Sequence, residues 1–298
     1  MSTLSDIIVS RYNLTKEDNM KYSKMVLPVL KWVGGKRQLL PQIRKYMPRG
    51  FSTYYEPFVG GGAVLFDLQP QKAVINDINP ELINLYEVIR DDVEELIKDL
   101  GRYKNEPDFF YTIRELDRDT EVYNNLTKIE KASRIHYLNK TCYNGLFRVN
   151  NAGQFNAPFG KYKNPNITNE ITLRAVSKYF NNAKIIIRCS DFEEALKGIR
   201  KGSFVYFDPP YDPVSDSSNF TGYSKGGFNS SEQLRLRDLC DKLNSKGVKF
   251  LLSNSSTEFI HGIYRNYKII TIQAKRAINS DADNRGEVDE VLVMNYEQ

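Results

Sequence analysis

The stretch FVYFDPPYDP, residues 204–213, decides how the rest of the sequence can be organised. Its first four residues are apolar or aromatic, and such a run is typical of a strand buried on both faces of a parallel sheet. Pro209 and Pro210 end that strand, because neither has a backbone N–H to donate to a neighbouring strand. Open α/β folds bind their ligands at this carboxyl edge. We therefore expect a ligand site here, with a plain proline-rich turn as the structural alternative.

The residue types in this motif suit a planar ligand that carries an NH2 group. The Asp208 carboxylate and the rigid carbonyl of Pro209 offer two acceptors for the two hydrogens of such a group. The ring of Tyr211 offers a flat surface for its face.

A glycine-rich turn in YYEPFVGGG, residues 54–62, supplies a second part of the expected site. The pattern predicts a strand over 54–58 and a helix over 63–68, and the glycines between them let the backbone approach a ligand closely. Asp77 follows the next predicted strand, where an acidic side chain accepts hydrogen bonds from ribose hydroxyls. Because residues 54–71 contain no Lys or Arg, a phosphate-rich nucleotide is disfavoured. A nucleoside with a zwitterionic tail fits better, and S-adenosylmethionine is that ligand.

The segment KWVGGK, residues 31–36, precedes both motifs. It combines an aromatic residue, Trp32, with two glycines and with Lys36, whose ammonium group is suited to anchor a carboxylate. The alternative is the start of a helix with a buried tryptophan.

Predicted strands and helices alternate on both sides of a helical middle part, residues 92–140. The remaining strands are predicted at 73–76, 184–187, 204–207, 248–253, 269–272 and 288–295, and further helices at 80–90 and 231–246. This order predicts an α/β fold with a mainly parallel sheet that is interrupted by an insertion.

The basic residues are concentrated in that insertion. The whole chain carries a net charge of +5, whereas residues 131–178 hold eight basic residues and one acidic residue, a net charge of +7. Residues 143–162 are rich in Asn, Gly and aromatic side chains, a composition that predicts a hairpin turning at Asn150–Gly153. A basic module joined to a near-neutral body is typical of a polyanion-binding insertion. The alternative is a solvated charged face.

Several classes of protein are disfavoured by what the sequence lacks. Three cysteines lie far apart and two histidines have no metal-ligand spacing, so we expect neither disulfides nor a metal site. These residues are Cys142, Cys189, Cys240, His136 and His261. No apolar run approaches the roughly 18 residues that span a bilayer, and residues 1–23 lack the apolar stretch of a signal peptide. We expect a cytoplasmic protein without a membrane partner.

Beyond these local patterns, the sequence resembles a known family. The stretches KWVGGKRQLLPQI, YYEPFVGGGAVLFDL, INDIN, YNGLFRVN, FNAPFGKYKNP, SDF and FDPPY occur in the order of the Dam-like DNA adenine-N6 methyltransferases of the D12 class, in their α arrangement. The resemblance runs from Lys24 to Asn295 and is greatest to bacterial and phage members that act on GATC.

This resemblance implies a Rossmann-like S-adenosylmethionine-dependent methyltransferase sheet with an inserted helical and β-hairpin target-recognition domain. The implied boundaries are a tail at 1–23, a catalytic domain at 24–95 and 179–298, and a recognition domain at 96–178. The implied partner is double-stranded DNA, with functional pairing to a restriction endonuclease left open.

The resemblance also assigns roles to individual residues. The implied catalytic residues are Asp208, Pro209, Pro210 and Tyr211. The implied cofactor contacts are Trp32, Lys36, Phe58, Gly60, Asp77, Asp191, Phe192 and Asp208. The implied DNA contacts are Tyr143, Asn144, Leu146, Arg148, Pro158 and Lys161. For Leu146 and Pro158 the alternative is ordinary hairpin packing, and for Lys161 and Lys163 it is solvated charge.

Two other classes of function stay open at this stage. One is an amino-methyltransferase that acts on RNA or on a protein glutamine, although a glutamine substrate would not need a basic hairpin module. The other is a DNA-binding regulator without catalysis, against which the intact Asp77, Asp208, Pro209 and Tyr211 argue. Methylation of cytosine C5 is disfavoured, because that chemistry requires an activated cysteine, usually after a proline, and none of the three cysteines follows one.

Overall fold

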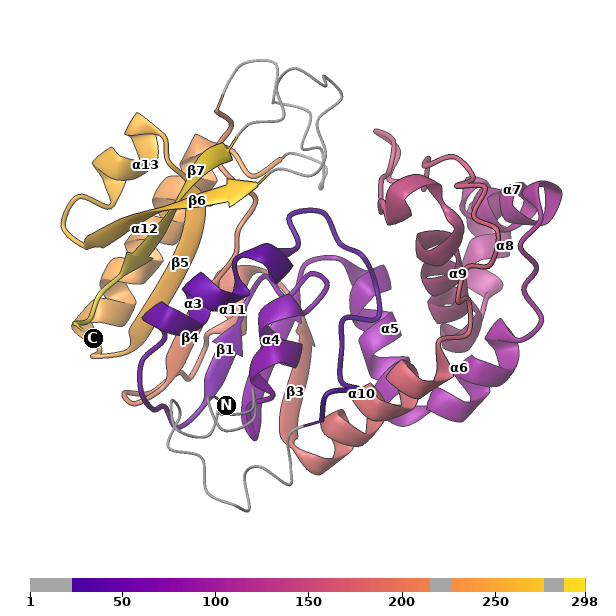
Figure 1. Cartoon of the computed structure of the whole chain (residues 1–298), viewed down its shortest axis with the longest axis horizontal. Helices are drawn as coiled ribbons and strands as arrows, with labels where there is room; N and C mark the ends of the chain where they lie inside the picture. The colour runs from indigo at the N-terminus through magenta and orange to yellow at the C-terminus, as the bar shows by residue number, and fades with distance from the viewer. Residues whose placement is uncertain (1–22, 215–226, 276–286, 298) are drawn as a thin grey trace, which may run out of the picture.

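A seven-stranded sheet forms the centre of the molecule, with its strands in the order β3-β2-β1-β4-β5-β7-β6 (Figure 1). The computed structural model describes residues 23–214, 227–275 and 287–297. The strands are β1 (Tyr54–Glu56), β2 (Lys72–Asp77), β3 (Lys184–Cys189), β4 (Phe204–Phe207), β5 (Lys249–Ser255), β6 (Lys268–Lys275) and β7 (Glu287–Met294).

The first five strands run parallel to one another, and β7 lies antiparallel between β5 and β6. This confirms the expected mainly parallel, Rossmann-like α/β sheet. The strand order reverses between the neighbouring strands β1 and β4. In open α/β sheets the ligand crevice lies beyond the carboxyl ends of the strands at such a reversal. A ligand site is therefore expected among the residues that follow β1 and β4.

Helices cover both faces of the sheet and extend to one side of it. They are α3 (Leu40–Tyr46), α4 (Ala63–Leu68), α5 (Pro80–Asp91), α6 (Val93–Leu100), α7 (Pro107–Glu115), α8 (Thr120–Asn125), α9 (Lys128–Thr141), α10 (Glu170–Asn182), α11 (Phe192–Ala195), α12 (Ser230–Ser245) and α13 (Glu258–Ile263), with the 3-10 turns η1 (Lys36–Gln38), η2 (Leu116–Arg118) and η3 (Tyr143–Gly145). Among the helices in the described ranges, none has the length and the apolar composition needed to cross a membrane.

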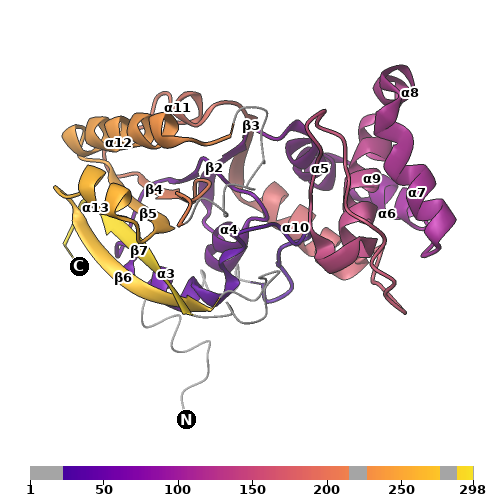
Figure 2. The ribbon, with the colours of Figure 1, turned by 90° about the horizontal axis from the view of Figure 1, so that it is seen from above.

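Figure 2 shows α11 and α12 on one face of the sheet and α3 and α4 on the other. Successive side chains of a strand point to opposite faces, and β4 illustrates the result. Phe204 and Tyr206 belong to one buried apolar cluster, whereas Val205 and Phe207 belong to the other. A strand that is buried on both faces explains why residues 204–207 are all apolar or aromatic.

Helices α6 to α9 form a module beside the sheet, with α9 packed against α5 and α6 (Figures 1 and 2). The stretch 92–140, predicted as helical, forms four separate helices, α6 to α9, and side chains cap the starts of two of them. Asp119 accepts hydrogen bonds from the first turn of α8, and Thr127 forms a capping box with Glu130 at the start of α9. Such caps satisfy the free N–H groups of a helix start, which explains why one predicted helical stretch is several helices.

The hairpin turn expected at Asn150–Gly153 is confirmed. The Gly153 N–H donates to the Asn150 carbonyl at 2.9 Å, and the Asn150 N–H donates to the Gln154 carbonyl at 2.8 Å. Beyond this turn, bridge pairing joins only Val149 to Phe155 and Cys142 to Phe159. The segment is therefore an irregular hairpin that depends on contacts with its surroundings.

One prediction concerns His136, which is fully buried on α9 with Nε2 3.0 Å from the Ile167 carbonyl. Burial lowers the pKa of His136 to about 3, whereas an unfolded histidine titrates near pH 6.5. Only the unfolded chain gains this proton between those values, so the free energy of unfolding should fall by about 1.4 kcal/mol per pH unit below about pH 6.5. Urea unfolding of wild type and His136→Gln tests this, and an equal pH slope in both proteins would contradict it.

Candidate functional site

The residues expected to bind the cofactor lie at one edge of the sheet. Asp208 directly follows β4, Phe58 and Gly60 follow β1, Asp77 ends β2, and Asp191 comes two residues after β3. All four strands are parallel, so their carboxyl ends meet at the same edge. The structure thus brings together motifs that are up to 150 residues apart in the printed sequence.

Asp208 forms a buried ion pair with Lys36. The Lys36 Nζ atom lies 2.6 Å from Asp208 Oδ1 and 2.6 Å from the carbonyl oxygen of Gly34. Ser253 Oγ donates to the same Asp208 oxygen at 3.2 Å. Burial raises the pKa of Asp208, while Lys36 and Ser253 oppose that shift. Lys36 and Ser253 both contact Oδ1, and Oδ2 has no donor among the residues that the structure describes.

The prolines after Asp208 differ in the state of their carbonyl groups. The Pro210 carbonyl accepts a hydrogen bond from Gln233 Nε2 at 3.0 Å. Within the described ranges, no donor reaches the carbonyl of Pro209. Among the residues that the structure describes, the Pro209 carbonyl and Asp208 Oδ2 are therefore two acceptors without partners at the end of β4.

Tyr211 is fixed at both its hydroxyl and its ring. Its hydroxyl donates to Glu290 Oε2 at 2.8 Å, and the Lys36 ammonium lies 4.5 Å from the ring centroid. A cation over a tyrosine ring is attracted by the negative face of the π system. Lys36 thus contacts both Asp208 and Tyr211, which places these side chains around one cation.

The glycine turn after β1 is held by hydrogen bonds to residues of β2 and α5. Asp77 Oδ2 accepts a hydrogen bond from the Gly60 N–H at 3.0 Å, and Asp77 Oδ1 accepts one from the Asn79 N–H at 2.9 Å. Tyr86 donates its hydroxyl to the Gly60 carbonyl at 2.7 Å. Gly60 has a φ of 46°, and a Cβ there would lie 2.9 Å from the Trp32 ring. Glycine is needed here because the turn and the indole approach so closely.

Trp32 links this turn to the helical module. Its ring stacks on Phe147 with centroids 4.8 Å apart and planes 18° apart. The Asn139 side chain, from α9, accepts from the Lys31 N–H at 2.9 Å and donates to the Lys31 carbonyl at 2.8 Å. Phe147 and Asn139 were not singled out in the sequence, although Phe147 lies within the quoted stretch YNGLFRVN.

Asp191 and Phe192 lie at the start of α11. Asp191 Oδ1 accepts from the Glu193 N–H at 2.9 Å, and its other oxygen pairs with Arg235. The Arg235 guanidinium lies 4.2 Å from the centroid of the Phe192 ring, which also packs against Phe58 at 5.3 Å. The Asp191 carboxylate therefore has protein partners at both oxygens, which the sequence did not reveal.

Two further residues at this edge were missed in the sequence. Ile78, next to Asp77, leaves 64% of its surface exposed. Glu56 is buried, accepts a hydrogen bond from the Tyr54 hydroxyl at 2.9 Å, and has a pKa held well above its usual value by burial. An acidic residue inside the apolar strand pattern of YYEPF was the available signal for Glu56.

The expected DNA contacts lie along the hairpin module. Tyr143 is 57% exposed and its N–H donates to the Pro158 carbonyl at 2.8 Å. Arg148 is exposed, and its Nε and terminal NH2 groups donate to the side-chain and backbone oxygens of Asn156 at 2.8 and 3.1 Å. Asn144, Pro158 and Lys161 are exposed and Leu146 is half-buried.

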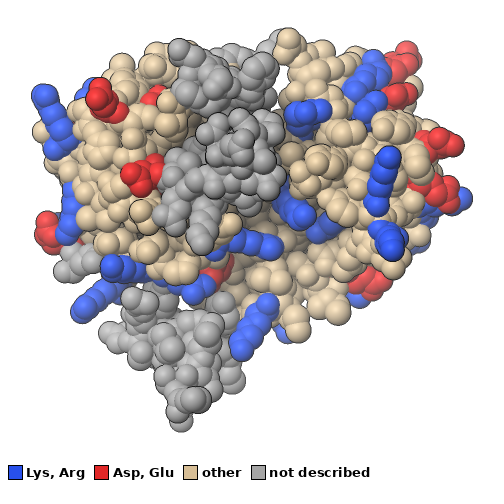
Figure 3. Space-filling model, turned by 45° about the horizontal axis from the view of Figure 1, so that its top comes forward, with Lys and Arg blue, Asp and Glu red and all other residues tan. Residues whose placement is uncertain are grey.

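Part of the positive charge counted in this segment is used inside the protein. Arg134 is 4% exposed and pairs with Asp117, and Arg174 pairs with both Glu94 and Glu170. On the face shown in Figure 3, other Lys and Arg side chains line the border between the sheet-containing body and the helical module. In the described ranges, no three His, Cys, Asp or Glu side chains group as they would to hold a metal ion.

Comparisons with known proteins agree with this geometry. Residues 32–278 match the family of D12 class N6 adenine-specific DNA methyltransferases. The Type II methyltransferase M1.LlaDCHI of Lactococcus lactis subsp. cremoris is 45% identical over 90% of this chain and 95% of its own length. The Type II methyltransferase M.MjaIII of Methanocaldococcus jannaschii is 42% identical over 91% of this chain and 99% of its own length. A DNA adenine methylase of Haemophilus influenzae is 33% identical over 94% and 97%, respectively. The chain therefore belongs to the D12 class of N6 adenine-specific DNA methyltransferases.

Proposed function

We propose that this enzyme transfers the methyl group of S-adenosylmethionine to N6 of an adenine that is turned out of duplex DNA, within the sequence GATC. The observation that carries the proposal is a pair of acceptors at the end of β4, Asp208 Oδ2 and the Pro209 carbonyl, which have no partner in the described part of the chain and lie beside Tyr211. They match the two hydrogens of an exocyclic amine and the face of its ring. RNA and protein glutamine are less suitable targets, because the family acts on DNA.

The residues at the edge of the sheet fit S-adenosylmethionine. A carboxylate has about four acceptor positions, so Asp77 can accept from ribose hydroxyls in addition to its two backbone donors. Ile78, which is 64% exposed, offers apolar surface for the adenine ring of the cofactor, whereas the Phe192 ring is buried and covered by Arg235. Lys36 uses two of its three donors on Asp208 and Gly34, which leaves one for a carboxylate. When bound, the cofactor supplies an electrophilic sulfonium methyl group.

The chain's own residues then position the amine. The N6 lone pair of adenine is delocalised into the ring, so the group is a poor nucleophile. Accepting its two hydrogens at Asp208 Oδ2 and at the Pro209 carbonyl favours charge development on N6 and aligns the group for in-line transfer. Lys36 and Ser253 hold Oδ1 and fix the carboxylate plane. Asp208 is also the base nearest to the proton that N6 must lose.

Recognition of DNA is assigned to the hairpin module. The target base must leave the stack to reach the acceptors at the sheet edge, and stacking on Tyr211 would hold it there with about 1–3 kcal/mol. Tyr143, whose side chain is exposed, would fill the gap that the base leaves in the duplex. Arg148 suits a bidentate contact with guanine O6 and N7. GATC is proposed because YNGLFRVN and FNAPFGKYKNP resemble the members that act on it.

The names of the relatives bear on the biological setting. Identity is 45% and 42% to two Type II methyltransferases and 33% to several DNA adenine methylases. The higher identity to the Type II methyltransferases favours a modification enzyme that works beside a restriction endonuclease.

The reaction is tested by incubating duplex DNA with the enzyme and radiolabelled S-adenosylmethionine and then mapping the methylated positions. Label should appear on adenine N6 within GATC. Asp208→Ala should lower turnover by about 10²–10³-fold or more, because an acceptor aimed at the reacting group is lost. Asp208→Asn keeps one acceptor oxygen and should lie between Asp208→Ala and wild type. Label on cytosine or on RNA alone, or undiminished turnover in Asp208→Ala, would refute the proposal.

Asp77→Ala should weaken cofactor binding far more than DNA binding. Loss of hydrogen bonds to a charged group should raise the Kd for S-adenosylmethionine by roughly tenfold to a hundredfold. Asp77→Asn, which still offers an acceptor to the Gly60 N–H, should have a smaller effect. Calorimetry with each ligand separately provides the measurement. Equal weakening of both ligands would mean that Asp77 serves only to hold the glycine turn.

Arg148→Ala should relax sequence preference, because a contact with a base edge specifies a sequence whereas a phosphate contact only positions the duplex. The discrimination ratio is the methylation efficiency on a GATC duplex divided by that on duplexes with one outer pair changed. Its expected fall is about 5- to 150-fold, the value of one bidentate pair. Lys161→Ala is the matched control. As a phosphate contact it should weaken all duplexes alike and make the salt dependence shallower by about one unit of slope.

A uniform loss of activity on every duplex in Arg148→Ala would assign Arg148 to the DNA backbone. In that case the hairpin would not be the element that reads the sequence.

A further inference from the structure

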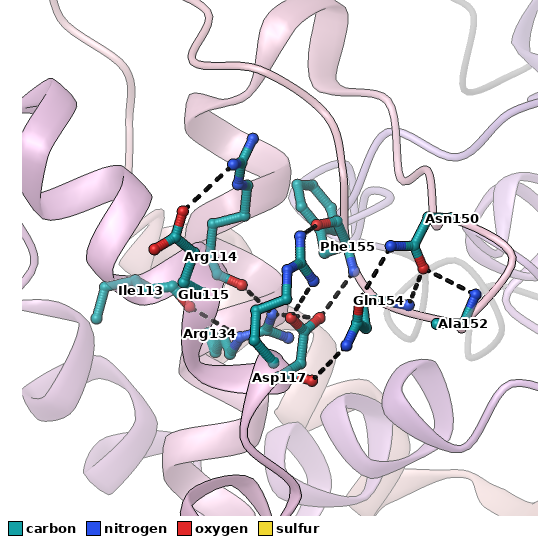
Figure 4. A network of polar contacts seen from close by, with 10 residues as sticks. Ile113, Arg114, Glu115, Asp117, Arg134, Asn150, Ala152, Gln154 and Phe155 are labelled. Atoms are coloured by element: carbon teal, nitrogen blue, oxygen red, sulfur yellow. Dashed lines mark hydrogen bonds and ion pairs between the residues drawn. The ribbon is translucent and has the colours of Figure 1, made fainter.

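A buried ion pair lies beneath the hairpin, between the module's central helix and the turn η2. Arg134 of α9 is 4% exposed, and one of its terminal nitrogens lies 2.7 Å from Asp117 Oδ2 (Figure 4). The same guanidinium donates to the carbonyls of Ile113 and Arg114 at 3.0 and 2.8 Å. A buried arginine requires such partners, since an unpaired charge away from water is costly. The position of Asp117 is thus fixed by the fold of the helices.

Asp117 and its neighbour Arg118 bind the hairpin backbone. Asp117 Oδ2 accepts a hydrogen bond from the Phe155 N–H at 2.7 Å, and Arg118 donates to the Phe155 carbonyl at 2.6 Å. Arg118 also pairs with the Asp117 carboxylate. Both polar groups of the Phe155 backbone are therefore held by two adjacent side chains of η2.

The hairpin needs this support because of how its two segments pair. The ladder hydrogen bonds around Phe155 come from its neighbours, with the Asn156 N–H donating to the Arg148 carbonyl at 2.9 Å and the Asn150 N–H donating to the Gln154 carbonyl at 2.8 Å. In an antiparallel pair the residue between such bonds directs its own N–H and C=O outward. Asp117 and Arg118 occupy that outer edge, where a third strand would pair. A two-stranded hairpin alone is only marginally stable.

A short path of hydrogen bonds leads from this edge to Arg148. Phe155 is followed directly by Asn156, whose side-chain and backbone oxygens both accept from the Arg148 guanidinium, at 2.8 and 3.1 Å. On the other side, the Asn150 side chain accepts from the N–H groups of Ala152 and Gln154, each at 3.0 Å (Figure 4). The position of Arg148 relative to the helices therefore depends on where Phe155 is held.

We propose that Asp117 and Arg118 are positioning residues for sequence specificity, which fix the hairpin so that Arg148 meets its base at the correct place. The inference rests on the proposed function of Arg148 as the residue that reads a base edge. Neither Asp117 nor Arg118 needs to touch DNA for this role. The position of the hairpin matters because hydrogen bonds to a base edge form only within a narrow range of distances and angles.

The test compares Arg118→Ala with Arg114→Ala. Both variants remove one cation from the same segment, but the Arg114 side chain pairs with Glu115 and makes no hydrogen bond to the hairpin in the described residues (Figure 4). The measurement is the discrimination ratio, the methylation efficiency on short GATC duplexes divided by that on duplexes with one outer pair changed. Arg118→Ala should lower this ratio by about tenfold, part of the value of one bidentate base contact, while Arg114→Ala should leave it unchanged.

A loss of folded protein would lower activity on every duplex by the same factor and leave the ratio intact, so the readout separates positioning from stability. Asp117→Asn, which keeps an acceptor but loses the charge that Arg134 and Arg118 share, should lower both the ratio and the melting temperature. If Arg118→Ala retains the wild-type ratio, the proposal is wrong.

A double variant shows whether Arg118 acts through Arg148. In Arg118→Ala/Arg148→Ala the ratio should equal that of Arg148→Ala alone, because residues on one path are not additive. A further fall in the double variant would mean that Arg118 acts independently, against the proposal. If Arg148→Ala itself keeps full discrimination, the role of Arg148 fails. If Arg148→Ala loses discrimination and Arg118→Ala does not, only the positioning role fails.

Discussion

The ion pair between Lys36 and Asp208 is the contact on which the organisation of the site depends. It joins a segment that precedes β1 to the carboxyl end of β4 across 2.6 Å, with the lysine side chain 6% exposed. Burial alone raises the pKa of Asp208 and so favours its neutral form, which would be a weaker acceptor. The ammonium group opposes that shift and also lies over the Tyr211 ring. One cation thereby sets both the charge of the acceptor and the environment of the ring beside it.

The segment that carries Lys36 also carries the junction between the two parts of the molecule. Four residues before Lys36, Trp32 lies close to Gly60 and stacks on Phe147 of the hairpin. Its neighbour Lys31 is bound through both backbone groups to Asn139 of α9. In the proposed function, target reading and chemistry are therefore connected through one short stretch of chain, residues 31–36.

The sequence predicted those features that depend on local pattern. The strands and the Asn150–Gly153 turn follow from apolar runs and turn residues, and the convergence of Asp77 and Asp208 follows from the parallel arrangement. Contacts between distant segments were not predictable. The stack of Trp32 on Phe147 and the burial of Arg134 depend on how helices pack, which no residue pattern encodes. For the same reason the count of +7 over residues 131–178 overstated the charge available to a polyanion, because Arg134 is paired in the interior and Arg174 is paired with carboxylates at the surface.

The hydrogen bonds between Arg148 and Asn156 bear on how a small hairpin can read sequence at all. A free arginine loses up to about 2 kcal/mol of side-chain entropy when it is immobilised, which offsets much of what a base contact contributes. Here Nε and one terminal nitrogen donate to oxygens of Asn156. A guanidinium has five N–H donors, so others remain for a guanine edge while these bonds persist. The ordering of Arg148 then belongs to the folding of the hairpin, so the proposed base contact would not have to offset this entropy loss again.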